Sequence, residues 1–215
     1  MDETLTPRER RALRTREAIL DAARKIISKD GVDGLSMRNI ADAIDYSPAG
    51  LYEYFGGKEE IIHAVIEQGF ARFTQALENV DTTLPAREYA REVGLAYIHF
   101  AVRNPDFFLL MFTTAPLSEI YQETHQRPKD RASAVAMLRN EPSFAVLYRA
   151  IARAVDEGLY HPQPGFGVFE MALTSWSHVH GIAMLRVTTF RELPIDFTDL
   201  DRAALDALFR GLSKP

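Results

Sequence analysis

The sequence predicts an all-α protein, and three observations lead to that prediction. Apolar residues recur at helical three-and-four spacing along almost all of the 215 residues. No segment shows the convincing alternation of apolar and polar residues that a half-buried strand requires. Proline and glycine stand between the periodic segments, at points where helices are expected to stop. Short helices near the N-terminus and longer ones after it therefore form the expected architecture.

The first predicted helix carries an apolar stripe from Ala18 to Ile27 and ends at Gly31, a residue type that suits the position after a helix. Ser36 is expected to cap the next helix, residues 37–43, with its side-chain oxygen. Asn39 occupies the position where a complete capping box has a glutamate, so that box is incomplete. One short helix thus follows the first long one.

Ser47 and Pro48 predict the start of a third helix after the short connection 44–46. Proline loses nothing at the first helical position, because the N–H there has no partner within the helix. This helix is expected over residues 48–54 and should stop at Gly56-Gly57. A fourth helix, residues 58–80, carries a long apolar stripe.

The rest of the chain is also expected to be helical, after a boundary at residues 81–85. Pro142 should interrupt one long helical region, because proline removes a backbone donor, and Gly158 should end it. A polar stretch, residues 118–130, is expected to be a loop or a helix end, and residues 161–165 form a stiff connector. The predicted helical stretches are residues 86–103, 107–112, a region around 131–158, 166–190 and 199–212.

Composition excludes several classes of function. The chain has no cysteine, which rules out disulfides, thiolate metal sites and cysteine nucleophiles. No apolar run reaches the roughly 20 residues that a membrane helix needs, and the charged N-terminus has no apolar signal core, so we expect a cytoplasmic protein without membrane contact. No nucleophile setting or phosphate-binding loop is recognisable, and histidines are scattered, so we expect no enzyme activity, cofactor or metal.

The net charge of the chain is −5. A negatively charged protein repels the phosphates of nucleic acid, so this chain is not expected to bind nucleic acid with its whole surface. The charges are unevenly distributed: residues 1–58 hold ten basic and ten acidic residues, whereas the remainder holds fifteen and twenty. Five arginines cluster between Arg8 and Arg16 with only Glu9 opposing them. They form either a solvated helix face or an arm or first turn that lies along phosphates.

The two short helices, with their three- to four-residue turn and the long helix before them, form a helix-turn-helix. Ala49 and Gly50 would let the backbone approach base edges closely. Tyr52 and Tyr54 could donate their hydroxyls to phosphates from the flanks. Lys58 adds a charge beside the free N–H groups at the start of the next helix, and both attract a phosphate.

Residues 35–43 (LSMRNIADA) and 47–60 (SPAGLYEYFGGKEE) resemble the DNA-binding domain of the TetR family, and the LYxYFxxKEE part is highly specific for it. The resemblance covers roughly residues 15–63. It implies an N-terminal three-helix helix-turn-helix DNA-binding domain, residues 1–63, followed by a helical effector-binding and dimerisation domain, residues 64–215. Asp45 replaces the usual turn glycine, and aspartate tolerates the left-handed backbone that such a turn needs. Tyr46 replaces a small apolar residue.

The resemblance also implies roles for individual residues, and a double-stranded operator as partner. Ser36, Ser47, Tyr52, Tyr54 and Lys58 match positions that contact phosphates. Arg38, Pro48, Ala49 and Gly50 match positions that can reach base edges. The chain is then expected to be a ligand-responsive repressor. The alternative is a helical small-molecule-binding or scaffold protein whose helix-turn-helix mediates protein contacts.

The C-terminal part resembles one TetR C-terminal class, through Trp176-Ser177-His178-Val179-His180-Gly181 and the stretch 101–112. Trp176 and His180 share a helix face, either as a pocket wall or as a core pair with a hydrogen-bonded histidine. We expect an apolar or amphipathic small-molecule effector. The residues that could line its pocket, or simply form core, are Phe100, Phe107, Phe108, Met111, Phe112, Tyr121, Tyr148 and Trp176.

Two C-terminal helices have more apolar width than a small domain needs, which predicts a homodimer with a four-helix interface. The interface residues expected from the three-and-four spacing are Phe169, Leu173, His180, Ala183, Val187, Leu205, Leu208, Phe209 and Leu212.

Overall fold

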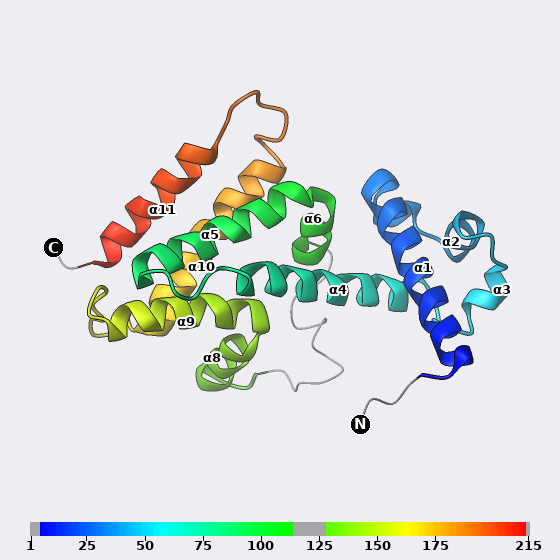
Figure 1. Cartoon of the computed structure of the whole chain (residues 1–215), viewed down its shortest axis with the longest axis horizontal. Coiled ribbons are helices and arrows are strands. Elements are labelled where there is room, and N and C mark those ends of the chain that lie inside the picture. The colour runs from blue at the N-terminus through cyan, green and yellow to red at the C-terminus, as the bar shows by residue number, and fades with distance from the viewer. Residues whose placement is uncertain (1–4, 114–127, 214–215) are drawn as a thin grey trace.

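The computed structural model describes residues 5–113 and 128–213, and within those ranges every regular element is helical apart from two isolated β-bridges. Helices α1 (Pro7–Asp30), α2 (Met37–Ala43) and α3 (Pro48–Leu51) gather at one end of the molecule (Figure 1). A single 3-10 turn, Val32–Gly34, links α1 to α2. Helix α4 (Lys58–Glu78) runs from this end into the other helices. Those are α5 (Ala86–Arg103), α6 (Pro105–Thr113), α8 (Arg131–Asn140), α9 (Pro142–Asp156), α10 (Val168–Val187) and α11 (Thr198–Leu212).

Gly31, Pro142 and Gly158 mark helix boundaries where the sequence predicted them. Gly31 and Gly158 adopt φ values of 73° and 71°, in the left-handed region that glycine enters without steric cost. Pro142 is the first residue of α9 and separates it from α8. The Glu141 carboxylate accepts hydrogen bonds from the backbone N–H groups of Ser143 and Phe144, which caps α9 at its start.

Several element boundaries differ from the prediction, most clearly those of α1, α3 and α10. Helix α1 begins at Pro7 because Thr6 and Glu9 form a capping box, so the arginine-rich segment is helical and not an extended arm. Helix α3 ends at Leu51, and residues 52–54 form a turn in which Tyr54 N–H donates to the carbonyl of Leu51 at 2.9 Å. Helix α10 covers residues 168–187, shorter than the expected 166–190.

Two hydrophobic cores share helix α4. Its first half supplies Ile61 and Val65 to a core built with α1, α2 and α3, and its second half supplies Phe73 and Leu77 to the core of the larger part. Phe70 and Phe107 pack against both cores. The domain boundary predicted after residue 63 therefore falls inside one continuous helix. None of the helices within residues 5–113 and 128–213 is long and apolar enough to span a bilayer.

Candidate nucleic-acid interface

Serine caps define the two short helices of the helix-turn-helix. The Ser36 hydroxyl oxygen accepts from Asn39 N–H at 3.1 Å, and the Ser47 hydroxyl oxygen accepts from Gly50 N–H at 3.0 Å. The Asn39 side chain donates to the carbonyl of Gly34 at 2.9 Å, so it braces the preceding turn instead of completing a capping box. Each serine accepts with its oxygen and keeps its O–H available to donate.

The turn between α2 and α3 depends on Asp45. Its φ of 54° is the one positive value among the described non-glycine residues, as expected for the residue at the usual glycine position. Tyr46 N–H then donates to the carbonyl of Ala41 at 2.9 Å. The turn therefore survives without glycine.

Gly50 has a packing role that the sequence did not reveal. A Cβ atom at this position would lie 2.7 Å from Cε1 of Tyr46, closer than real Cβ contacts permit. The Tyr46 ring fills the space of the missing side chain and also packs edge-on against Tyr54, with ring centroids 6.3 Å apart. Tyr46 therefore also requires that Gly50 has no side chain, and the close approach of Gly50 to bases stays a prediction.

Residues predicted to read bases, together with two predicted phosphate contacts, Ser47 and Tyr52, form an exposed face. The Arg38 side chain is 84% exposed and makes only a long ion pair, 4.0 Å, with Asp42. Ser47, Pro48 and Ala49 are exposed at the start of α3. Tyr52 follows α3 and is 58% exposed, unusually high for a tyrosine that could pack on the adjacent core. Apart from Ser47 and Pro48, which begin α3, these residues have little role in holding the fold together.

Tyr54 and Lys58 lie at the edge of that face, where α4 begins. Tyr54 is half-buried, and its hydroxyl raises the pKa of Tyr46 through a hydrogen bond. Lys58 is the first residue of α4 and is half-buried. The Glu60 carboxylate accepts from Gly56 N–H at 2.6 Å, so one backbone donor at this helix start is already engaged.

The arginine cluster divides into two groups. Arg8, Arg10, Arg11 and Arg14 are exposed on the first turns of α1. Arg16 is different: its guanidinium lies 4.1 Å from the centre of the Phe55 ring and donates to the carbonyl of Tyr54 at 3.1 Å. It fixes α1 to the segment after α3. The sequence did not predict the contacts of Arg16 with Phe55 and Tyr54, because no local pattern links residues that far apart. It also did not predict the packing of Tyr46 against Gly50.

The residues predicted to line an effector pocket pack mainly against one another. Phe108 and Met111 are fully buried and belong to the core in this arrangement, and a contact between them and a ligand stays a prediction. The cavity that reaches Trp176 has a volume of about 10 Å³. Phe100 is buried, whereas Phe107, Phe112 and Tyr148 are partly exposed. Tyr121 lies outside the described residues.

Trp176 and His180 form a stacked pair, with ring centroids 5.3 Å apart, on the inner side of α10. His180 Nδ1 lies 2.8 Å from the Tyr97 hydroxyl of α5. Of the two interpretations offered by the sequence, the core pair with a hydrogen-bonded histidine describes this geometry. In the part of the chain that the structure describes, no group of three or more His, Asp or Glu side chains could hold a metal ion.

Most residues predicted for the dimer interface belong to the protomer's own core. Ala183, Val187, Leu205, Phe209 and Leu212 are buried within it, so their side chains have no surface to offer a partner. Phe169, Leu173, His180 and Leu208 are half-buried against the same core or its aromatic rings. For the five buried residues the three-and-four spacing was interpreted correctly as apolar but assigned to the wrong side, since inward and outward faces have the same period, whereas the four half-buried residues stay predicted interface residues. The exposed residues are Thr174, Ser177, His178, Gly181 and Leu185 on α10, and Thr198, Asp199, Leu200, Arg202, Ala203, Ala207, Arg210 and Gly211 on α11.

Comparison with known proteins matches both parts of the chain. The family described as "Bacterial regulatory proteins, tetR family" matches residues 19–65, and "Tetracyclin repressor-like, C-terminal domain" matches residues 90–208. The transcriptional repressor NicS of Pseudomonas putida is 32% identical over 130 residues, which are 60% of this chain and 59% of NicS. The transcriptional regulator UidR of Escherichia coli is 40% identical over 70 residues, 31% of this chain and 36% of UidR. The chain thus aligns with less than two thirds of either relative.

Solved structures align over nearly the whole chain. A protein of unknown function from a Rhodococcus species has a TM-score of 0.71 and 27% identity, and the alignment covers 93% of this chain and 95% of that one. The regulator PfmR from Thermus thermophilus has a TM-score of 0.63 and 23% identity, over 91% of this chain and 99% of that one. At that identity the second likeness concerns the fold alone.

Proposed function

Because the chain belongs to the tetR family of bacterial regulatory proteins, we propose that it is a DNA-binding transcriptional repressor that acts as a homodimer. The observation that supports this most directly is the exposed face of the helix-turn-helix. Arg38, Ala49 and Tyr52 lie on it without any role in holding the fold together. Repression, rather than activation, follows the name of the relative NicS.

In this proposal the contacts fall into two groups. Ser36, Ser47, Tyr52, Tyr54 and Lys58 donate to backbone phosphates and fix the orientation of the protein on the duplex. Arg38, Pro48 and Ala49 reach the base edges in the major groove and supply sequence preference. Gly50 contributes by letting Tyr46 pack beneath α3. Arg8, Arg10, Arg11 and Arg14 add positive charge along the adjacent backbone.

The homodimer would use the outward faces of α10 and α11. These helices pack against each other, and small and apolar residues are exposed on both, with Leu185 and Leu200 strongly exposed beside Arg202. Gly181 and Gly211 face open space, which would allow close approach of a second helix pair. Twofold pairing would hold two copies of α3 about 34–36 Å apart, which suits successive major grooves of a near-palindrome.

An apolar or amphipathic small molecule is the proposed effector, bound in residues 64–215. Phe112 and Trp176 are partly exposed beside the buried aromatic cluster, whereas the cavity next to Trp176 is far smaller than the roughly 300–1,000 Å³ of a typical ligand site. Binding would therefore have to separate these rings. An effector that separates them favours a different arrangement of the helices, which is what release of DNA requires.

The proposal is tested by selecting bound duplexes from a random pool with the full-length protein, followed by affinity measurements at several salt concentrations. We expect a palindromic consensus, with the selected duplex bound at least ~1,000-fold more tightly than a scrambled one. Binding that is equal for all duplexes, or absent, would overturn it. The alternative, a scaffold whose helix-turn-helix contacts proteins, predicts no duplex binding even at low salt.

A further inference from the structure

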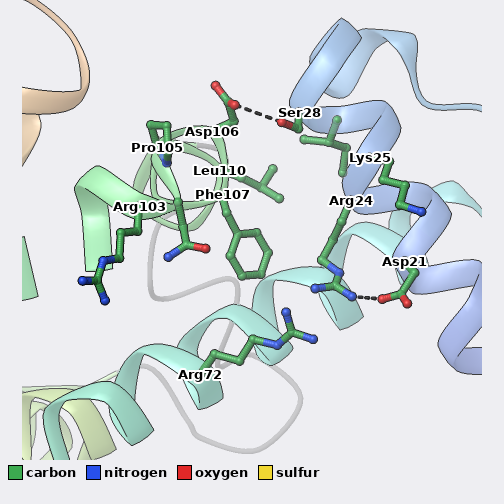
Figure 2. Close-up of a pocket in the computed structure, with 12 residues that line it drawn as sticks. Asp21, Arg24, Lys25, Ser28, Arg72, Arg103, Pro105, Asp106, Phe107 and Leu110 are labelled. Atoms are coloured by element: carbon green, nitrogen blue, oxygen red, sulfur yellow. Dashed lines mark hydrogen bonds and ion pairs between the residues drawn. The ribbon is translucent and has the colours of Figure 1, made fainter. Parts of the chain in front are cut away.

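A cleft of about 580 Å³ opens where the DNA-binding end meets the larger part (Figure 2). Its walls come from the second half of α1, the middle of α4 and the junction of α5 with α6. Figure 1 shows α6 on one side of α1, and α2 and α3 on the other. The cleft therefore opens away from the residues proposed to contact DNA, so a duplex that binds those residues leaves it accessible.

Positive charge dominates the lining. Arg24 and Lys25 of α1, Arg72 of α4 and Arg103 of α5 stand against two carboxylates, Asp21 and Asp106. Both carboxylates are engaged, because Asp21 forms an ion pair with Arg24 and Asp106 accepts from Ser28 at 2.9 Å and Arg191 at 3.2 Å. Within residues 5–113 and 128–213, no carboxylate lies within ion-pair distance of Lys25, Arg72 or Arg103.

Two of these arginines face each other from the two parts of the molecule. The guanidinium groups of Arg24 and Arg72 extend towards one another in Figure 2. Burial lowers the pKa of Arg24, and the charge of Arg72 lowers it further. The Nε–H of Arg24 is buried and has no hydrogen-bond partner among the described residues. The ion pair with Asp21 engages one terminal nitrogen of Arg24 but leaves its Nε–H unsatisfied, and Arg72 has no counterion among the described residues, so the two guanidinium groups together favour an added anion beside them.

The rest of the cleft offers an apolar surface beside this pair. Phe107 and Leu110 of α6 and Ile27 of α1 line it, and the Phe107 ring lies next to the two guanidinium groups in Figure 2. Helix α6 is held tightly to α4 at Gly69, where a Cβ atom would lie 2.8 Å from the Met111 sulfur. The α4–α6 wall is thus firm, and the cleft volume falls in the range of small-molecule sites.

We propose that this cleft binds a small organic oxyanion, with its phosphate or carboxylate group between Arg24 and Arg72 and its apolar part on Phe107 and Leu110. Arginine suits this role because its planar fork binds such groups through two hydrogen bonds. The bound anion ties α1 to α4 and α6 and so sets the orientation of the DNA-reading helices. This regulatory consequence rests on the proposed function, whereas anion binding does not.

The test is a calorimetric titration of the full-length protein, without DNA, with phenyl phosphate, benzoate and the neutral analogue benzyl alcohol. We expect at least one of the two anions to bind and benzyl alcohol not to bind. Arg72→Gln, at an exposed position, should weaken binding about tenfold or more, because it removes charge-assisted hydrogen bonds. Arg149→Gln is the matched control, since Arg149 is an exposed arginine on α9 outside the cleft. Absence of anion binding, or equal binding by both variants, overturns the proposal.

A second measurement addresses regulation. Affinity for the selected duplex should change on adding the anion with wild-type protein and stay constant with Arg72→Gln. An anion that binds but leaves duplex affinity unchanged overturns the regulatory half. If no duplex is selected at all, the proposed function fails, while the titration still decides whether the cleft is an anion site.

Discussion

The hydroxyl of Tyr97 lies 2.8 Å from Nδ1 of His180, and this contact joins α5 to α10. Burial raises the pKa of Tyr97 far above its usual value, so the phenol keeps its proton. Burial lowers the pKa of His180, so the imidazole is neutral near pH 7. Tyr97 therefore donates to a neutral ring whose other nitrogen, Nε2, carries the proton. Trp176 stacks on the same ring and shields it.

Acidification should destabilise the fold through His180. In the unfolded chain the histidine takes up a proton near its ordinary pKa of about 6.5, whereas the folded chain resists protonation to lower pH. The free energy of unfolding therefore falls as the pH drops below about 6.5. The fall ends once the pH lies below the pKa of His180 in the folded chain. Thermal unfolding at pH 7.5 and 5.5 should show a smaller loss of Tm for His180→Asn than for wild type. His178→Asn, on the exposed side of α10, is the control, and equal pH dependence in both variants would contradict the assignment.

Lys58→Ala should weaken binding to all duplexes to a similar extent, because a phosphate contact carries no sequence information. It should also lower the slope of log affinity against log salt by about one unit. Titrations of the selected and a scrambled duplex at several salt concentrations measure both effects. Lys29→Ala, an exposed lysine at the far end of α1, should leave the slope unchanged. A loss confined to the selected duplex would show that Lys58 reads bases.

Arg38→Ala should relax the preference for particular base pairs and cost about 1–3 kcal/mol on the selected duplex. Its 84% exposed side chain is free to leave Asp42 and enter a groove. Asp42→Asn is the paired control, because it removes the ion-pair partner and keeps the arginine. Affinities for single-base variants of the consensus provide the measurement. Equal losses on selected and scrambled duplexes would make Arg38 a phosphate contact.

Gly50→Ala should lower both Tm and operator affinity, because the added Cβ would lie 2.7 Å from the Tyr46 ring. The ring must move, and with it the packing against Tyr54. The double variant Tyr46→Ala, Gly50→Ala removes the obstruction and should recover much of the Tm loss. If Gly50→Ala loses affinity with unchanged Tm, glycine is needed for approach to DNA and not for packing.

Ala207→Glu should give monomers, because it places a charge on the outward face of α11 that we propose to pair with a second copy. Sedimentation at micromolar concentration measures the change, and the monomer should bind a palindrome weakly. Ala136→Glu, an exposed alanine on α8, should remain dimeric. A wild type that is itself monomeric would rule out the interface.

The sequence predicted helix boundaries well wherever a single residue determines them. Gly31, Pro142 and Gly158 act through their own backbone restrictions, and Ser36 and Ser47 cap helices through hydrogen bonds within three residues. Such local effects are visible in one sequence. Helix α3 was predicted too long because residues 52–55, which follow its last residue Leu51, include no proline or glycine. The first glycine after Leu51 is Gly56.

What the sequence did not predict depends on contacts between distant segments. The period of α10 and α11 shows that each has an apolar stripe, but the choice between core and partner is made by α5, which packs against both. The brace from Arg16 to Phe55 and the cleft between Arg24 and Arg72 likewise join residues far apart in the chain. Only the folded arrangement brings these side chains together.

Helix α4 has one half in each core, so there is no flexible joint within it to absorb a movement of the larger part. Its 21 residues span about 30 Å, and a tilt of about 10° about one end displaces the other by about 5 Å. That displacement is comparable with one turn of an α-helix. Under the proposed function, a rotation too small to disturb the packing around Phe73 would be magnified at Lys58, so this rigid helix would convert a slight rearrangement into a misfit with the grooves of DNA.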